Sequence, residues 1–85
     1  MSDFYAPYIS AEKTAKHLRM LRRERGLSVK QVAELIFCGT QSVYDWEAGK
    51  CLPEISRLLG ISRVYGISIN EILVCEGEDF AFYAA

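Results

Sequence analysis

The sequence contains few of the residues on which catalysis, metal binding and disulfide frameworks depend. It has one histidine, His17, and three cysteines among 85 residues. The cysteine number is odd and no C-x-x-C spacing occurs, which argues against disulfides and against a zinc site. A single histidine supplies neither a metal cluster nor a histidine-based catalytic triad. We therefore expect reduced cysteines, no metal, no cofactor and no enzymatic activity.

Longer sequence signals are absent as well. No apolar run approaches the roughly 18 residues of a membrane span, and the first residues lack the basic and apolar regions of a signal peptide. Neither a G-x-S-x-G motif nor a phosphate-cradling glycine loop occurs. The length fits one small domain with a modest core, and 51% of the residues are hydrophobic, slightly above the usual share. These properties predict a single cytoplasmic domain without a membrane segment.

The net charge of −1 is unevenly distributed along the chain. Residues 10–30 contain seven basic and two acidic side chains, a net charge of +5, whereas residues 31–85 contain three basic and eight acidic ones, a net charge of −5. A basic first helix suits contact with DNA phosphates, which supply most of the sequence-independent affinity. A basic run alone more often marks a solvated helix face, so this interpretation depends on the neighbouring motif.

Apolar periodicity and capping signals predict five helices, at about 11–25, 29–36, 40–48, 53–65 and 69–74. Pro53 is expected in the first turn of the fourth helix. The apolar stripe of that helix is predicted to consist of Ile55, Leu58, Leu59, Ile61 and Val64. We interpret residues 1–9 as an aromatic arm, residues 10–75 as the folded domain, and residues 76–85 as an acidic and aromatic tail.

Two capping boxes mark helix starts. Ser28 is followed three residues later by Gln31, so each side chain can bond a backbone amide in the other's turn. Ser68 and Glu71 repeat this arrangement before the fifth helix. Because a short turn separates the second helix from the third, the two together have the layout of a helix-turn-helix.

The third helix has one apolar and one polar side. Val43 and Trp46 lie three residues apart and share one helical face, so we expect Trp46 in the core and the polar residues outside. A short helix with one buried edge and one polar edge fits the major groove of DNA.

From about residue 14 to residue 74, the chain resembles the phage-repressor and Cro-type (XRE-like) helix-turn-helix DNA-binding domains. The matching residues are Leu18, Leu21, Arg22, Gly26, Leu27, Ser28, Val32, Ala33, Glu34, Val43, Trp46, Glu47, Gly49, Lys50, Leu52, Pro53 and the run from Gly66 to Leu73. The resemblance implies an all-α, five-helix, lambda-repressor-like domain whose helix-turn-helix is formed by helices 2 and 3. It also implies a partly buried ion pair between Arg22 and Glu47.

The resemblance further implies which residues contact DNA. Thr40, Gln41 and Asp45 correspond to positions that reach base edges in these repressors. The residues expected at phosphates are Ser28, Lys30, Ser42, Tyr44, Lys50 and Arg19. Glutamine can pair bidentately with adenine, aspartate can accept from the cytosine amino group, and a threonine methyl can touch that of thymine. An ordinary solvent-exposed helix face is the alternative interpretation.

Two residues depart from the family pattern. Where the turn normally has a left-handed glycine, this chain has Phe37, and Gly39 is the candidate to take over that role. A turn remodelled in this way would shift the register of Thr40 and Gln41 by one. The other departure is Asp45, whose negative charge beside DNA favours a protein partner instead.

The sequence thus predicts a sequence-specific double-stranded DNA-binding protein, a transcriptional regulator that acts as a repressor, from a bacterium or phage. We expect a homodimer on a pseudo-palindromic operator, paired through the arm residues Phe4, Tyr5 and Tyr8 or the tail residues Phe80, Phe82 and Tyr83. The first alternative is a non-catalytic, antitoxin-like protein-interaction module that uses the arm or the tail. The second is a redox switch based on Cys38.

Overall fold

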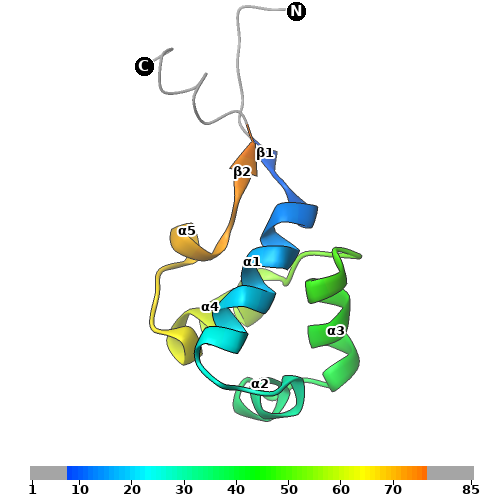
Figure 1. Ribbon diagram of the computed structural model, residues 1–85, viewed down its shortest axis with the longest axis vertical. Coiled ribbons are helices and arrows are strands. Elements are labelled where there is room, and N and C mark those ends of the chain that lie inside the picture. Colours follow the sequence, from blue (N-terminus) through cyan, green and yellow to red (C-terminus); the bar gives the residue numbers. More distant parts are fainter. Residues whose placement is uncertain (1–7, 77–85) are drawn as a thin grey trace, which may run out of the picture.

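The computed structural model describes residues 8–76 and consists mainly of helices (Figure 1). In chain order the elements are β1 (Tyr8–Ile9), α1 (Ala11–Glu24), α2 (Val29–Leu35), α3 (Thr40–Ala48), α4 (Ile55–Tyr65), α5 (Ile69–Ile72) and β2 (Cys75–Glu76). The predicted all-α, five-helix class is therefore confirmed. Within the described residues, no helix is both long and apolar enough to cross a bilayer.

The five helices share one hydrophobic core. Its buried side chains are Leu18 and Leu21 of α1, Val29, Val32, Ala33 and Ile36 of α2 and its end, Val43 and Trp46 of α3, Leu58, Ile61 and Tyr65 of α4, and Ile72 of α5. In α1 to α4 these residues include pairs spaced three or four apart, which lie on one helical face. Trp46 is 7% exposed, as expected for a core residue.

Both predicted capping boxes are present. The Ser28 hydroxyl accepts from the Gln31 N–H, and the Gln31 side chain accepts from the Ser28 N–H. Ser68 and Glu71 make the same pair of bonds before α5. Since each box satisfies two backbone donors that a helix start leaves unpaired, it fixes where α2 and α5 begin.

The start of α4 differs from the prediction. Glu54 is the N-cap, so Pro53 precedes the helix and does not occupy its first turn. Inside α4, Gly60 lies against α2, where an added Cβ would come within 3.0 Å of the Ile36 Cγ2 atom. The close approach of the two helices explains a glycine whose helix propensity costs about 1 kcal/mol relative to alanine.

The predicted apolar stripe of α4 was partly wrong. Leu58 and Ile61 are buried, but Ile55 and Leu59 are 69% and 54% exposed. Tyr65, which the stripe omitted, is buried instead. The spacing from Leu58 through Ile61 to Tyr65 follows one helical face, whereas Leu59 lies off that face and Ile55 belongs to the first turn.

The turn between α2 and α3 corrects a third expectation. Phe37 itself takes the left-handed conformation, with φ of 58°. Gly39 has φ of −79° and is the N-cap of α3, so it does not replace the family's glycine. The predicted start of α3 at Thr40 is therefore not shifted.

The sequence analysis predicted no strands, yet the first and last described residues pair antiparallel. The register joins Tyr8 to Glu76 and Ile9 to Cys75. Next to this pair, the Ser10 N–H donates to the Val74 carbonyl at 2.8 Å, and the buried Thr14 hydroxyl accepts from the Val74 N–H at 2.9 Å. The paired strands thus lie at the end of the molecule opposite α2 (Figure 1).

Candidate nucleic-acid interface

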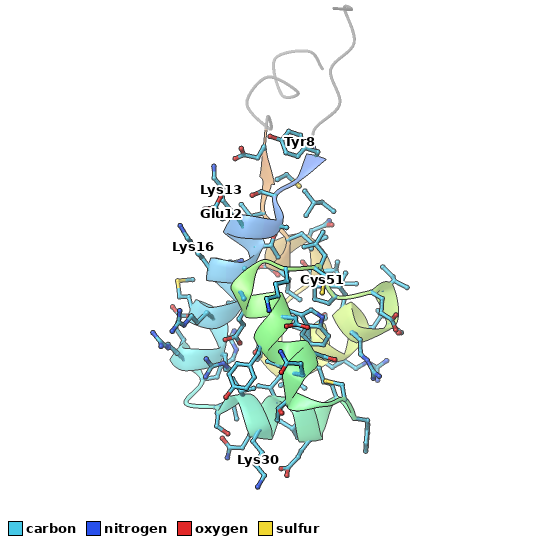
Figure 2. All side chains as sticks on the ribbon, turned by 90° about the vertical axis from the view of Figure 1, so that its right-hand side faces the viewer. Tyr8, Glu12, Lys13, Lys16, Lys30 and Cys51 are labelled. Carbon is cyan, nitrogen blue, oxygen red and sulfur yellow. The ribbon has the colours of Figure 1, made fainter. Side chains whose placement is uncertain are left out.

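The core contacts of α3 determine which of its side chains face solvent. Val43 and Trp46 are buried between the helices, and α3 packs on both α1 and α2. Thr40, Gln41 and Tyr44 therefore lie on the exposed side. α3 forms the right-hand side of the molecule in Figure 1 and faces the viewer in Figure 2.

Two shallow hollows flank α3. The hollow toward α4 has a volume of about 300 Å³ and is lined by Ser42, Trp46, Cys51, Leu52, Glu54 and Arg57. The hollow toward α1 has a volume of about 220 Å³ and is lined by Arg19, Arg22, Tyr44, Glu47 and Ala48. Because different faces of α3 line the two hollows, the helix stands between them as a ridge. Such a ridge has the shape needed to enter a groove.

A bidentate ion pair holds α3 against α1. The Arg22 Nε donates to Glu47 Oε2 at 2.8 Å, and the Arg22 Nη2 donates to Glu47 Oε1 at 2.9 Å. The two side chains are only 12% and 8% exposed. The Arg22 Nη1 also donates to the Leu27 carbonyl at 3.0 Å, which ties the turn after α1 to the pair. The hydrogen bond with Glu47 raises the pKa of Arg22, so the guanidinium stays charged.

Several basic residues of the predicted basic run have structural partners. Lys13 forms an ion pair with Glu76, and this bond raises the pKa of Lys13. The Arg25 Nε donates to the Tyr65 carbonyl at 2.9 Å, and its guanidinium carbon lies 5.3 Å from the centre of the Tyr65 ring. Burial raises the pKa of Tyr65 to about 12, so the ring is neutral beside the guanidinium. The positive charge available to a ligand is therefore smaller than the sequence suggests.

Four cations of α1 and α2 are not neutralised by a close ion pair in the described part of the chain. Arg19, Arg23 and Lys30 form no ion pair within residues 8–76, and Lys16 has only a 4.0 Å contact with Glu12. Arg19 lines the hollow toward α1. In Figure 2, Lys16 lies to one side of α3, and Lys30 lies below it. The positive charges of Lys16, Arg19 and Lys30 thus lie on two sides of α3.

Ser28 and Lys30 lie at the start of α2, where phosphate contacts were expected. The backbone N–H of Ser28 already donates to the Gln31 side chain at 2.8 Å. This amide is therefore not available to bind a phosphate. The hydroxyl proton of Ser28 is the group that could still donate a hydrogen bond to one. The exposed ammonium group of Lys30 has no such partner within residues 8–76.

Three of the expected DNA-contacting residues touch one another. The Gln41 Nε2 donates to Asp45 Oδ1 at 2.9 Å, and the Lys50 Nζ lies 3.9 Å from the same oxygen. The family resemblance implies separate DNA contacts for these three residues. A glutamine four residues before an aspartate on a helix was the signal for this bond. Thr40, the first residue of α3, is exposed, and Ser42 lines the hollow toward α4.

The cysteines do not form an obvious reactive centre. Burial raises the pKa of the Cys38 thiol, which lowers its population of reactive thiolate. Cys51 is exposed beyond the end of α3 (Figure 2). In the described part of the chain, no three side chains of histidine, cysteine, aspartate or glutamate come together as a metal site.

Comparisons with known proteins find similar helix-turn-helix domains. A family profile described as a helix-turn-helix domain matches residues 15–73. The HTH-type transcriptional regulator DdrOP3 of Deinococcus deserti is 34% identical over 68 residues, which are 80% of this chain and 51% of the regulator. The HTH-type transcriptional activator BcrR of Enterococcus faecalis is 32% identical over 56 residues, 66% of this chain and 28% of the activator. The chain thus spans about half or less of these relatives.

Two solved structures are similar in fold. The restriction-modification controller protein C.AhdI of Aeromonas hydrophila superposes with a TM-score of 0.69 at 26% identity, over 73% of this chain and 94% of the controller. Bacillus thuringiensis PlcR, solved in complex with the peptide PapR7 and DNA, superposes with a TM-score of 0.68 at 33% identity, over 72% of this chain and 21% of PlcR. The similarity covers the helical domain in both cases.

Proposed function

Because the chain belongs to the helix-turn-helix domain family, we propose that it binds double-stranded DNA through the exposed face of α3 and regulates transcription. The observation that carries this proposal is the ridge of α3, with Gln41 on its outer side and, beside it, Arg19 and Lys30, which form no ion pair within residues 8–76. A ridge bordered by positive charge suits a groove bordered by phosphates. The PlcR structure, which contains DNA, supports the same role for this fold.

In this proposal the residues have two kinds of role. Thr40 and Gln41 reach base edges, while phosphates are contacted by Arg19, Lys30, Ser42, Tyr44 and Lys50, with Ser28 contributing its hydroxyl. Arg22 and Glu47 hold α3 in position and do not touch DNA, since their charged groups already bond each other. The protein acts in the cytoplasm without a cofactor and without catalysis.

We also propose that it binds as a homodimer to a pseudo-palindromic operator. One α3 offers few base-contacting side chains, and the overall charge of −1 gives little non-specific affinity. Two copies on half-sites about 34–36 Å apart would double the specific contacts. Tyr8 is exposed in β1 and is a candidate dimer contact. The other predicted contacts, Phe4 and Tyr5 in the arm and Phe80, Phe82 and Tyr83 in the tail, lie outside the described residues. Light scattering with and without operator DNA measures the number of protein copies in the free protein and in the complex.

Repression is the proposed direction of regulation. Occupancy of an operator suffices to block transcription, whereas activation needs a further contact with the transcription machinery. A reporter gene placed under the selected operator should be expressed less when the protein is supplied. A rise in expression would show activation, the direction named for BcrR.

A protein-interaction module is the second candidate function. The observation that favours it is a set of large apolar side chains outside the core. Those with at least half of their surface exposed in α2, the turn after it and α4 are Leu35, Phe37, Ile55 and Leu59. Apolar side chains that gather on a surface often mark a partner site. This function would not require DNA. A binding titration on duplex DNA therefore distinguishes the two candidate functions.

The test is a binding titration on duplex DNA at several salt concentrations. We expect the logarithm of affinity to fall linearly with the logarithm of salt, by about 0.9 per neutralised phosphate. Lys30→Ala should reduce this slope by about 1. Arg63→Ala is the matched control, because Arg63 is an exposed cation of α4 that lines neither hollow. No binding in about 50 mM salt, or an affinity independent of salt, would favour the protein-interaction function.

A further inference from the structure

The outer side of α3 carries a bonded pair of side chains whose chemistry goes beyond helix stabilisation. Gln41 is exposed, and its Nε2 donates to Asp45 Oδ1 at 2.9 Å. Asp45 is 31% exposed, and its Oδ1 also lies 3.9 Å from the Lys50 Nζ. The glutamine amide is therefore held at its nitrogen, while its oxygen has no hydrogen-bond partner among residues 8–76.

A carboxylate determines which end of the amide is held. An ionised carboxylate only accepts hydrogen bonds, so the nitrogen of Gln41, and not its oxygen, must face Asp45. The amide nitrogen has two protons, one on the side of Oε1 and one on the opposite side. When Asp45 accepts from the N–H that points away from Oε1, the opposite edge of the amide presents Oε1 as an acceptor and the second N–H as a donor.

An unrestrained glutamine can recognise two different purines. Adenine presents the N7 acceptor and the N6 donor in the major groove, which match one amide N–H and the amide oxygen. Guanine presents two acceptors, N7 and O6, which an amide nitrogen can meet with both of its protons. A free glutamine side chain can rotate to serve either base, so it discriminates poorly between them.

We propose that Asp45 is a positioning residue that makes Gln41 selective for adenine over guanine. It occupies one amide proton, so Gln41 can no longer offer the two donors that guanine requires. The remaining donor and acceptor match adenine. This inference rests on the proposed DNA binding by α3, and it replaces the direct cytosine contact that the sequence analysis assigned to Asp45.

Lys50 completes the arrangement. A carboxylate near DNA phosphates is repelled by them, and Lys50, 3.9 Å from Asp45 Oδ1, offsets that charge. Asp45 can then lie beside the groove while it accepts the hydrogen bond from Gln41. Gln41, Asp45 and Lys50 act as one unit in which only Gln41 meets the base.

The experiment compares four proteins: the natural chain and the variants Gln41→Ala, Asp45→Ala and Asp45→Asn. Selection on randomised duplexes defines the preferred site, and the position at which Gln41→Ala loses its preference is the base pair that Gln41 reads. Two duplexes that differ only in adenine or guanine at that position are then titrated in competition. Circular dichroism confirms that each variant is folded.

The natural chain should prefer the adenine duplex by about 5- to 150-fold, the range of one bidentate contact. Asp45→Ala should lower this ratio at least about fivefold, mainly by binding the guanine duplex more tightly. Asp45→Asn should keep the preference, because the asparagine oxygen can accept the same bond. The asparagine variant should also bind both duplexes more tightly, since a negative charge is removed.

Three results would overturn the inference. One is an unchanged adenine-to-guanine ratio in Asp45→Ala, which would mean that the pair stabilises the helix only. Another is a changed preference at a different base pair in Asp45→Asn, which would mean a direct contact between Asp45 and a base. The third is a failure of the natural chain to bind any duplex, which also refutes the proposed function, whereas the first two leave DNA binding intact.

Discussion

Phe37 combines two unfavourable properties in the turn between α2 and α3. Its φ of 58° lies in the left-handed region, and its side chain is 88% exposed. A residue with a Cβ atom is strained there by roughly 1–2 kcal/mol, and an exposed ring recovers little of that cost by packing. The sequence indicated an unusual turn, but it could not show which residue takes the left-handed conformation, because Gly39 lies only two positions away.

Replacing Phe37 by glycine should stabilise the domain. Phe37→Gly relieves the strain, while the greater freedom of glycine in the unfolded chain returns part of the gain. We expect a net increase of about 0.5–1 kcal/mol in the free energy of unfolding, measured by urea denaturation. Phe37→Ala is the control, since it removes the ring but keeps the Cβ atom and so the strain. A loss of stability in the glycine variant would show that the Phe37 ring makes a stabilising contact.

Breaking the Arg22–Glu47 ion pair should destabilise the domain, and by more than the Phe37 substitution stabilises it. Glu47→Ala leaves the guanidinium of Arg22 largely buried without its carboxylate, and breaking such a pair typically costs about 3 kcal/mol. For a domain of this size the melting temperature should fall by on the order of 10 °C. Glu47→Gln retains one acceptor for Arg22 and should lose less. Equal melting temperatures for Glu47→Ala and the natural chain would contradict the structural role of the pair.

Residue-level features of the site could be predicted from the sequence only in part. The family resemblance implied the Arg22–Glu47 pair, and the structure contains it with two hydrogen bonds. The hydrogen bond between Gln41 and Asp45 was not predicted. Base-recognition rules consider one side chain at a time, so each of the two residues was predicted to contact a base separately. The base and phosphate contacts themselves remain predictions.

Among the elements, α2 and α5 begin with capping boxes that differ in one chemical respect. α2 uses the neutral Gln31 and α5 uses Glu71, although both side chains accept from the N–H of the capping serine. The hydrogen bonds from Ser68 hold the pKa of Glu71 below its ordinary value of 4.5. Only the start of α5 is therefore sensitive to acid through its capping box.

This difference predicts a specific pH dependence. Because the folded-state pKa of Glu71 is lowered, its contribution to stability is present above about pH 4.5 and is lost as the pH falls through the lowered value. Glu71→Gln, which copies the box of α2, should make the loss of stability between pH 5 and pH 3 shallower. Some slope should remain, since Lys13 also lowers the pKa of Glu76. Urea denaturation at each pH measures the free energy of unfolding. The same pH dependence in Glu71→Gln and the natural chain would refute the role of Glu71 in acid sensitivity.

Element boundaries could be predicted where a local chemical signal exists. The caps at Ser28 and Ser68 identified the starts of α2 and α5, and Gly49, with φ of 79°, ends α3 where expected. The strands could not be predicted, because two-residue segments have no periodicity and their pairing joins Tyr8 to Glu76 across the whole domain. The buried face of α4 was partly misassigned, since apolar residues stand on more than one side of that helix.

For the whole molecule, the sequence was informative about the fold class because apolar spacing, caps and turns all agree on a five-helix domain. It was less informative about charge. The net charge of +5 predicted for residues 10–30 overstates what a ligand meets, because Lys13, Arg22 and Arg25 have partners inside the fold. Which cations are free depends on tertiary contacts, and those could not be read from charge counts.

The pairing of β1 with β2 has a topological consequence. Since Tyr8 and Glu76 are hydrogen-bonding neighbours, a short peptide joining them in a chain of residues 8–76 alone would close the backbone into a ring without moving a helix. The ring could be cut between Cys51 and Leu52, which are exposed in the loop between α3 and α4, so that α4 came first in the chain and α3 last. Every helix would keep its spatial neighbours in this circular permutant. The packing of the helices in space is therefore compatible with several orders of the helices along the chain, of which the natural order is one.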